Sequence, residues 1–202
     1  MDIDFESYQR ERRLIDLHKA GAYALKLSIL WAALFLLSYI CIWKNKFALH
    51  HIKTVFSSIG FADVFAVIGL SFIVMLLGIV LHELIHGFFF GLFAKSGFKS
   101  ISFGFLPKYL AAYCHCSEPL LVQHYLLGAL APGIILGVVP SILALVTGSF
   151  ALLMFGFFFT VSAVGDLMIV RLLKNENKNI YVLDHPSEPG CFILKPTQSN
   201  KR

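Results

Sequence analysis

Residues 64–93 read VFAVIGLSFIVMLLGIVLHELIHGFFFGLF, a run that is almost wholly apolar except at the pentapeptide His82-Glu83-Leu84-Ile85-His86. A membrane helix needs about 20 apolar residues to cross about 30 Å of hydrocarbon, so this run predicts a membrane-spanning helix. An ionisable group in the middle of such a helix costs about 2.5–3.5 kcal/mol on insertion scales. Three titratable groups within five residues are therefore candidates for function.

The pentapeptide has the spacing of a metal-binding motif. On a helix, positions i and i+4 lie on the same face, so His82 and His86 can direct imidazole nitrogens at one ion. Glu83 lies beside that ion without being a ligand and can take a proton from a water there. Zinc is the metal that this arrangement usually selects, so we predict a Zn²⁺ site with Glu83 as the catalytic base. The alternative is that these side chains only form hydrogen bonds between helices.

The composition of the whole chain indicates a membrane protein. Of its 202 residues, 57% are hydrophobic and 14% charged, and the mean hydropathy is +0.75. Further apolar stretches at about residues 27–43, 126–146 and 150–170 bring the predicted spans to about four. The runs are continuous rather than alternating, which favours helices over a β-barrel. We expect an all-α membrane protein, with residues 1–202 forming a single integral membrane domain around a four-span core at 22–173.

The distribution of charge predicts the orientation of the chain. Residues 1–21 mix basic and apolar side chains, which predicts an amphipathic helix on the membrane surface. With four spans, all but three of the 17 Lys and Arg fall on the side shared by both ends; the exceptions are Lys44, Lys46 and Lys53. The positive-inside rule then places both ends, including the tail at 174–202, in the cytoplasm. The net charge of +5 therefore follows from topology, and we expect no nucleic-acid partner.

The last predicted span supplies a candidate third ligand. Spans two and four run in the same direction, with His82 about eighteen residues into one and Asp166 about sixteen into the other, so the two lie at similar depth. Catalytic zinc takes three protein ligands and leaves a fourth position to water. We therefore expect Asp166 to be the third ligand, with Gly165 allowing a neighbouring backbone to approach closely. The alternative for Asp166 is that it bonds another helix or ends a helix at the headgroup boundary. His124, at the entrance to span three, is the alternative ligand.

Three short motifs carry a resemblance to known proteins. H-E-L-I-H-G at residues 82–87, A-P-G at 131–133 and S-x-x-G-D at 162–166 resemble a small bacterial family of zincin peptidases. More broadly, an HExxH helix followed by a late Gly-Asp span looks like the intramembrane zinc metalloproteases of the site-2-protease type. The resemblance implies a zinc-dependent metallopeptidase of the bacterial cell membrane that acts on membrane proteins or peptides. Site-2 proteases carry Asn-Pro or Leu-Asp-Gly near the third ligand, whereas here Asp166 precedes Leu167.

Short strands are expected in two places outside the spans. Residues 99–116 read as two strands about a turn near Pro107, a hairpin at the cytoplasmic boundary. Its exposed edge can bind an extended substrate by strand addition, although the hairpin can equally be a simple connection. Residues 179–194 read as a second hairpin, in which Asp184 and His185 are explained as turn residues.

Span three is unusually rich in glycine and proline, with Pro132 and Pro140 both inside it. Proline removes a backbone hydrogen-bond donor, so the freed carbonyls there line a cavity or face another helix. A broken helix of this kind can admit the water that hydrolysis needs, and close packing through small residues is the alternative.

Other functions use the same residues. The chain can be a hydrolase that trims lipid-modified peptides, a metal transporter, or a non-proteolytic membrane metal-binding or scaffold protein with a protease-like site. A chain with four spans and a single metal site is too simple to favour a transporter. A scaffold is disfavoured because His82, Glu83 and His86 are all intact. The sequence carries no signal for an oligomeric state.

Overall fold

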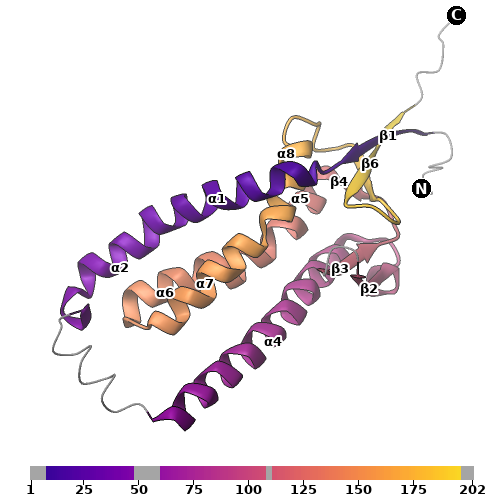
Figure 1. The fold of residues 1–202 in the computed structure, drawn as a ribbon. Coiled ribbons are helices and arrows are strands. Elements are labelled where there is room, and N and C mark those ends of the chain that lie inside the picture. Colours follow the sequence, from indigo (N-terminus) through magenta and orange to yellow (C-terminus); the bar gives the residue numbers. More distant parts are fainter. Residues whose placement is uncertain (1–7, 48–59, 108–110, 197–202) are drawn as a thin grey trace, which may run out of the picture. The chain divides into compact units, whose positions relative to one another are not determined.

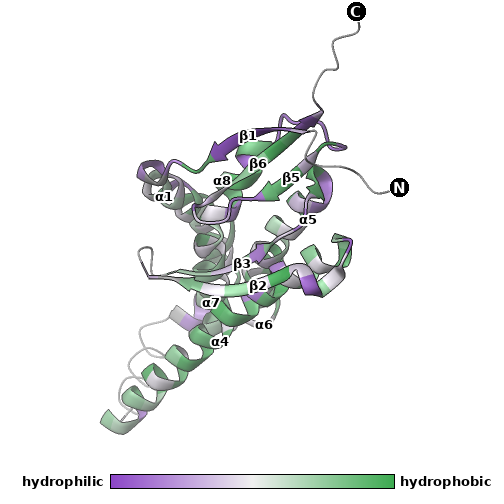
Figure 2. Ribbon diagram, turned by 90° about the vertical axis from the view of Figure 1, so that its right-hand side faces the viewer, coloured by the Kyte–Doolittle hydropathy of each residue, from purple (hydrophilic) through white to green (hydrophobic). Residues whose placement is uncertain are grey.

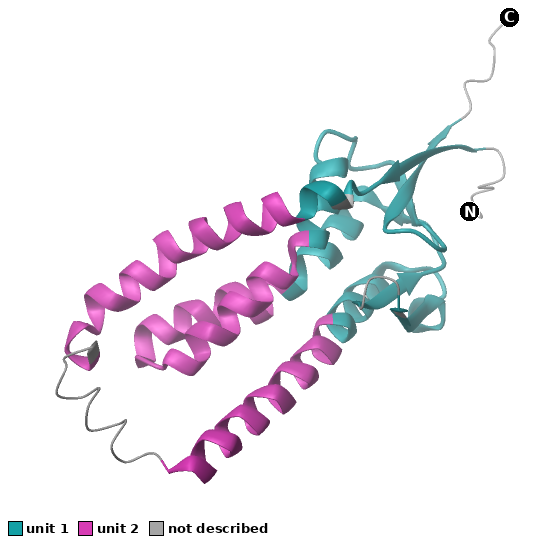
Figure 3. Ribbon diagram, viewed as in Figure 1, with its two compact units in different colours: residues 1–20, 83–132, 165–202 teal, residues 21–82, 133–164 magenta. Residues whose placement is uncertain are grey.

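The computed structural model describes residues 8–47, 60–107 and 111–196, most of which are helical (Figure 1). The chain divides into two compact units (Figure 3). Unit 1 comprises residues 1–20, 83–132 and 165–202, and unit 2 comprises residues 21–82 and 133–164.

Three helical segments are long and apolar enough to cross a membrane. The first joins α1 (Ala20–Trp31), a π-helical turn (Ala32–Leu36) and α2 (Leu37–Ile42); the second is α4 (Phe61–Phe93); the third joins α5 (Val122–Pro132), a π-helical turn (Gly133–Val138) and α6 (Val139–Thr147). Short 3₁₀ turns occupy Leu17–Lys19, Lys44–Phe47 and Gly97–Ser100. Three of the predicted spans are therefore confirmed as long apolar helices.

The fourth predicted span is interrupted rather than continuous. It consists of α7 (Phe150–Ser162) and α8 (Val164–Leu173), which are separated at Ala163. The hydroxyl of Thr160 donates to the Gly156 carbonyl at 2.7 Å, and that of Ser162 donates to the Phe158 carbonyl at 2.9 Å. Side-chain hydroxyls that bond back to carbonyls four residues earlier destabilise a helix and often bend it, which accounts for a break at this point. Counting the pair as one span gives four.

Helix α4 is apolar along almost its whole length (Figure 2). At its start the Asp63 carboxylate accepts from the Gly60 N–H at 2.8 Å, one half of a capping box. It ends before Gly97, whose φ of +62° lies in the left-handed region that glycine adopts without strain. In its most apolar stretch only 6% of residues are buried by protein. Such a surface is stable in a lipid environment and not in water.

Unit 2 has a helical core built around Trp31, Tyr39, Ala144 and Leu153. The Trp31 indole N–H donates to the Ser141 hydroxyl at 3.0 Å, which in turn donates to the Gly137 carbonyl at 2.8 Å. A Cβ on Gly156 would lie 2.3 Å from Ser141 Oγ and 2.7 Å from the Gly137 carbonyl oxygen. Small residues therefore allow the close packing of this core. This packing is one of the two interpretations given above for the glycines and prolines of span three.

Unit 1 contains two antiparallel sheets. The larger has the strand order β1-β6-β5-β4, formed by Tyr8–Leu14 (β1), Gly190–Pro196 (β6), Tyr181–Asp184 (β5) and Leu120–Leu121 (β4). The smaller is a hairpin of β2 (Ile101–Leu106) and β3 (Ala111–Cys116). The strands of both predicted hairpins are confirmed, although residues 108–110 in the first predicted turn lie outside the described residues and the second hairpin is only part of a four-stranded sheet. The hydrophobic core of unit 1 includes Phe90, Val122, Tyr125 and Leu173.

The prediction of an amphipathic helix over residues 1–21 is wrong for its described part, because Tyr8–Leu14 form strand β1. This strand lies beside β6 (Figure 1), with Tyr8 opposite Pro196 and Leu14 opposite Gly190. Charges also meet across the pair, since Lys195 donates to Glu11 at 2.5 Å. Both the backbone partners and the countercharges come from the other end of the sequence, so the local pattern could not reveal them.

Candidate metal centre

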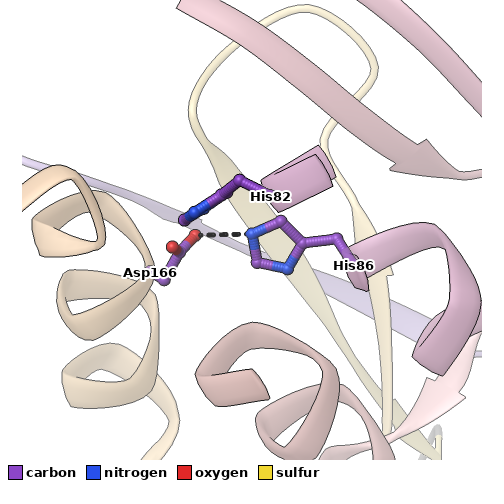
Figure 4. A group of neighbouring side chains, drawn as sticks. All are labelled: His82, His86 and Asp166. Carbon is purple, nitrogen blue, oxygen red and sulfur yellow. Dashed lines mark ion pairs between the residues drawn. The ribbon is translucent and has the colours of Figure 1, made fainter. Parts of the chain in front are cut away.

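The two histidines of the motif lie one turn apart on α4, and both are buried. Because α4 is continuous from His82 to His86, the helix itself sets the separation of the two rings. Asp166 lies in the first turn of α8. One ligand atom from each residue lies within 4.8 Å of the other two, and Figure 4 shows the three side chains pointing toward one another.

The separation of His86 and Asp166 fits a zinc ion bound by both. His86 Nε2 and Asp166 Oδ1 are 3.3 Å apart. Two tetrahedral ligands at the usual zinc distance of about 2.0–2.1 Å lie about 3.3–3.4 Å from each other. Two imidazoles and one carboxylate are also a donor set of catalytic zinc sites, which leave one position open. His82, His86 and Asp166 are therefore suited to hold this metal.

A second hydrogen bond orients the His86 ring. Its Nδ1 lies 2.9 Å from the carbonyl oxygen of Gly128 in α5. A carbonyl can only accept, so Nδ1 carries a hydrogen, and Nε2 is the nitrogen left to serve as a metal ligand. Nε2 is the atom that faces Asp166. The ring is thus held in the tautomer that a metal ligand on that side requires.

A cavity of about 170 Å³ opens beside this group in unit 1, and Glu83, His86 and Asp166 all line it. A single water needs about 10–15 Å³ on this measure, so the cavity has room for water and for part of a ligand. The remaining polar groups on its walls come from β3, α5 and β5, and they are Tyr113, Cys114, Tyr125 and Asp184. The carboxylate of Glu83 therefore lines the same water-accessible cavity as the two candidate ligands His86 and Asp166.

Asp184 is the residue of this cavity that sequence reasoning missed. It was expected in a turn, but it ends strand β5, is buried, and accepts from the Cys116 N–H at 2.8 Å and from the Tyr125 hydroxyl. Burial raises the pKa of Asp184, and these two hydrogen bonds offset part of the rise. The available signal was strand alternation, because Asp184 shares the inward face with Val182, which is also buried.

The Cys114 thiol lines the same cavity but is a poor candidate for a ligand. Burial raises the pKa of Cys114, and among the described residues the group of converging ligand atoms contains His82, His86 and Asp166 but not this thiol. A metal binds the thiolate rather than the thiol. Imidazole and carboxylate groups are therefore the better donors here.

His124, the alternative third ligand, has a different environment. Its ring stacks on Phe93, with the ring centroids 4.0 Å apart and the planes 11° apart. Among the described residues, the potential metal-binding group contains His82, His86 and Asp166 and not His124. Gly165 does not serve the close approach expected of it, because no described atom lies within 4 Å of where its Cβ would stand.

An HExxH helix joined by a carboxylate from a second helix is the kind of site that zincin metallopeptidases use. The family model described as "Putative zincin peptidase" matches residues 75–181, just over half of the chain, and the chain belongs to this family. The matched range contains His82, Glu83, His86 and Asp166. Neither a curated protein nor a solved structure matches the chain.

Proposed function

We propose that this protein is an intramembrane zinc metalloprotease that hydrolyses peptide bonds of membrane-embedded or membrane-adjacent substrates. One observation carries the proposal: ligand atoms of His82, His86 and Asp166 converge, and Glu83 lines the same cavity as the last two. Membership of a zincin peptidase family and the resemblance to site-2 proteases support the same reaction class.

The chemistry follows from the groups around the cavity. Zinc bound by the two histidines and Asp166 would polarise the scissile carbonyl and lower the pKa of a water to about 7. Glu83 takes the proton of the attacking water and passes it to the leaving amine. The Gly128 carbonyl accepts from His86 Nδ1–H and so keeps Nε2 of that ring directed at the metal position.

Strand pairing in unit 1 supports four membrane crossings with both ends on one side. An antiparallel sheet lies on a single side of a bilayer, so the chain must cross an even number of times between any two of its strands. Between β4 and β5 lie the α5–α6 segment and the α7–α8 pair. The interrupted pair must therefore return the chain across the membrane. The excess of Lys and Arg near both ends supports the cytoplasmic side of a bacterial cell membrane.

The position of the motif along α4 supports substrates near the membrane boundary. His82 follows Phe61 by 21 residues, or about 30 Å at 1.5 Å per residue, which is about the thickness of the hydrocarbon core. The site would therefore lie toward the end of the span that leads to the hairpin, where both lipid and water are close.

The packing of the β2–β3 hairpin supports a role in binding the substrate backbone. A Cβ on Gly87, the residue after His86, would lie 2.5 Å from the Phe103 ring of β2, so the hairpin packs directly on the metal-binding helix. Among the described residues, β2 pairs only with β3, which leaves its other edge open to an added strand. Strand addition would hold a substrate extended, as peptide hydrolysis requires.

The test uses the full chain purified in detergent and reconstituted in lipid vesicles. We expect about one zinc per chain by mass spectrometry, and zinc-dependent cleavage within a panel of transmembrane peptides followed by liquid chromatography. A chelator should stop the cleavage and added zinc should restore it. Zinc at one per chain with no cleavage of plain or lipid-modified peptides would instead support the metal-binding or scaffold alternative, and absence of zinc would refute the site.

A further inference from the structure

The carbonyl that orients His86 is unusual for a residue inside a helix. In an α-helix the carbonyl of residue i accepts from the N–H of residue i+4. For Gly128 that residue is Pro132, which lies within α5 and has no N–H. The Gly128 oxygen is therefore left available, and it lies 2.9 Å from His86 Nδ1.

Packing explains why this carbonyl comes so close to the histidine. A Cβ on Gly128 would lie 2.3 Å from the Phe90 ring, so glycine is needed for α5 to approach α4 here. The same Phe90 ring stacks on His86, with centroids 5.9 Å apart, and on Tyr125, with centroids 5.1 Å apart. The His86 ring is thus fixed at its face by Phe90 and at its Nδ1 edge by the Gly128 carbonyl.

We propose that Pro132 is a positioning residue for the metal centre. By withholding the helix's own donor from the Gly128 carbonyl, it leaves that oxygen to accept from His86 Nδ1–H and so directs Nε2 at the metal. This role rests on the proposed zinc site, but it acts through the tautomer of His86, which can be measured without metal. An N–H at position 132 would compete for the same oxygen and release the imidazole.

Span three offers a matched control. Pro140 is also buried, and it lacks the N–H that would reach the Leu136 carbonyl. It lies in α6, eight residues beyond Pro132, and does not line the cavity. Pro140→Ala thus makes the same chemical change in the same apolar segment without touching His86.

The experiment compares Pro132→Ala, Pro140→Ala and the unchanged chain in detergent. The ¹⁵N shifts of selectively labelled histidines in metal-free protein report the His86 tautomer, with His86→Gln used for assignment. We expect Nδ1 of His86 to be fully protonated in the unchanged chain and in Pro140→Ala, and only partly protonated in Pro132→Ala. Zinc affinity, measured by competition with a chelator, should fall about 10–100-fold in Pro132→Ala and less than about twofold in Pro140→Ala.

A third variant separates the missing N–H from the shape of the proline ring. Replacing Pro132 with lactic acid by nonsense suppression gives an ester at that position, which has no ring and also no N–H. We expect this ester protein to keep the native tautomer and zinc affinity. If the ester protein is folded by circular dichroism but loses both, the ring shape matters and the proposal is overturned.

The outcomes distinguish this inference from the function it rests on. If Pro132→Ala keeps the native tautomer and affinity, Pro132 has no positioning role even though zinc binds. If the unchanged chain binds no zinc, the proposed function fails while the tautomer measurement still decides what Pro132 does. Should Pro132→Ala be unfolded, the ester protein alone decides, because it must retain the native tautomer.

Discussion

Units 1 and 2 both bury polar side chains, but those of unit 2 pack against each other and those of unit 1 line a cavity. In unit 2, the Trp31 indole and Ser141 hydroxyl bond each other inside a tight cluster of helices that glycines allow to form. In unit 1, the carboxylates and imidazole of Glu83, His86 and Asp184 surround open space instead. Ionisable groups around a cavity are costly for folding, which makes them candidates for chemistry. Substitutions around the cavity of unit 1 should therefore change activity or metal binding, and those in the Trp31–Ser141 core of unit 2 should change stability alone.

The largest effect is expected at Glu83. Glu83→Gln removes the proton acceptor but keeps the size of the side chain, so peptide cleavage should fall about 10²–10⁴-fold while zinc content is unchanged. Initial rates in vesicles and zinc per chain measure the two quantities. Glu118→Gln is the control, because Glu118 accepts from the Ser96 N–H at 2.9 Å and does not line the cavity. Cleavage by Glu83→Gln at the native rate would remove this residue from the mechanism.

The ligands should give the next largest effect. His86→Ala and Asp166→Asn should each weaken zinc binding by more than about 100-fold, since even the outer hydrogen-bond partners of ligands are worth about 10–100-fold. Chelator competition measures the affinity. His124→Ala is the matched control and should keep native affinity, because its ring stacks on Phe93. The reverse pattern, with zinc lost in His124→Ala and kept in Asp166→Asn, would make His124 the third ligand.

Unit 2 should respond to a small increase in volume. Gly156→Ala places a methyl group 2.7 Å from the Gly137 carbonyl oxygen, and overpacking of this kind costs about 1–3 kcal/mol. Thermal unfolding in detergent should show a lower Tm, by about 2–4 °C per kcal/mol, with native zinc affinity. In Gly69→Ala, where no described atom lies within 4 Å of the new Cβ, the Tm should stay or rise slightly. A large loss of zinc affinity in Gly156→Ala would contradict a purely structural role for the Trp31–Ser141 core.

The smallest expected effect is the pH dependence that Asp184 gives to stability. Burial raises the pKa of Asp184 above its ordinary value of 3.8, so its contribution to stability is greatest below that value and declines as pH rises through the raised pKa. In metal-free protein, the Tm of the unchanged chain should therefore fall relative to that of Asp184→Asn as pH rises from acid to neutral. Parallel curves would mean that Asp184 has the same pKa in the folded and unfolded chain.

Sequence reasoning succeeded where the determining residues are close together or share a repeat. His82 and His86 follow from helix spacing, and the β2–β3 hairpin follows from two strands about a short turn. The approach of Asp166 followed from a depth argument about parallel spans, although the span that carries it is interrupted at Ala163.

The remaining features depend on partners that are distant in the sequence. Strand β1 pairs with β6 near the other end of the chain, so a basic segment that resembles a surface helix becomes part of a sheet. Freed carbonyls in span three were expected, but only the fold reveals that the one at Gly128 faces His86. Asp184 was assigned to a turn because the hydrogen bonds that it accepts from Cys116 and Tyr125 join three elements, β5, β3 and α5, that are distant in the sequence.

The pairing of β1 with β6 also sets the timing of biosynthesis. A ribosome that adds about 5–20 residues per second needs about 10–40 s to make the chain between these two strands. During that interval the apolar helices are synthesised while β1 has no strand partner. The sheet is completed only when β6 emerges, so β1 stays unpaired until then. Protection of β1 from proteolysis during stalled translation would report that last step.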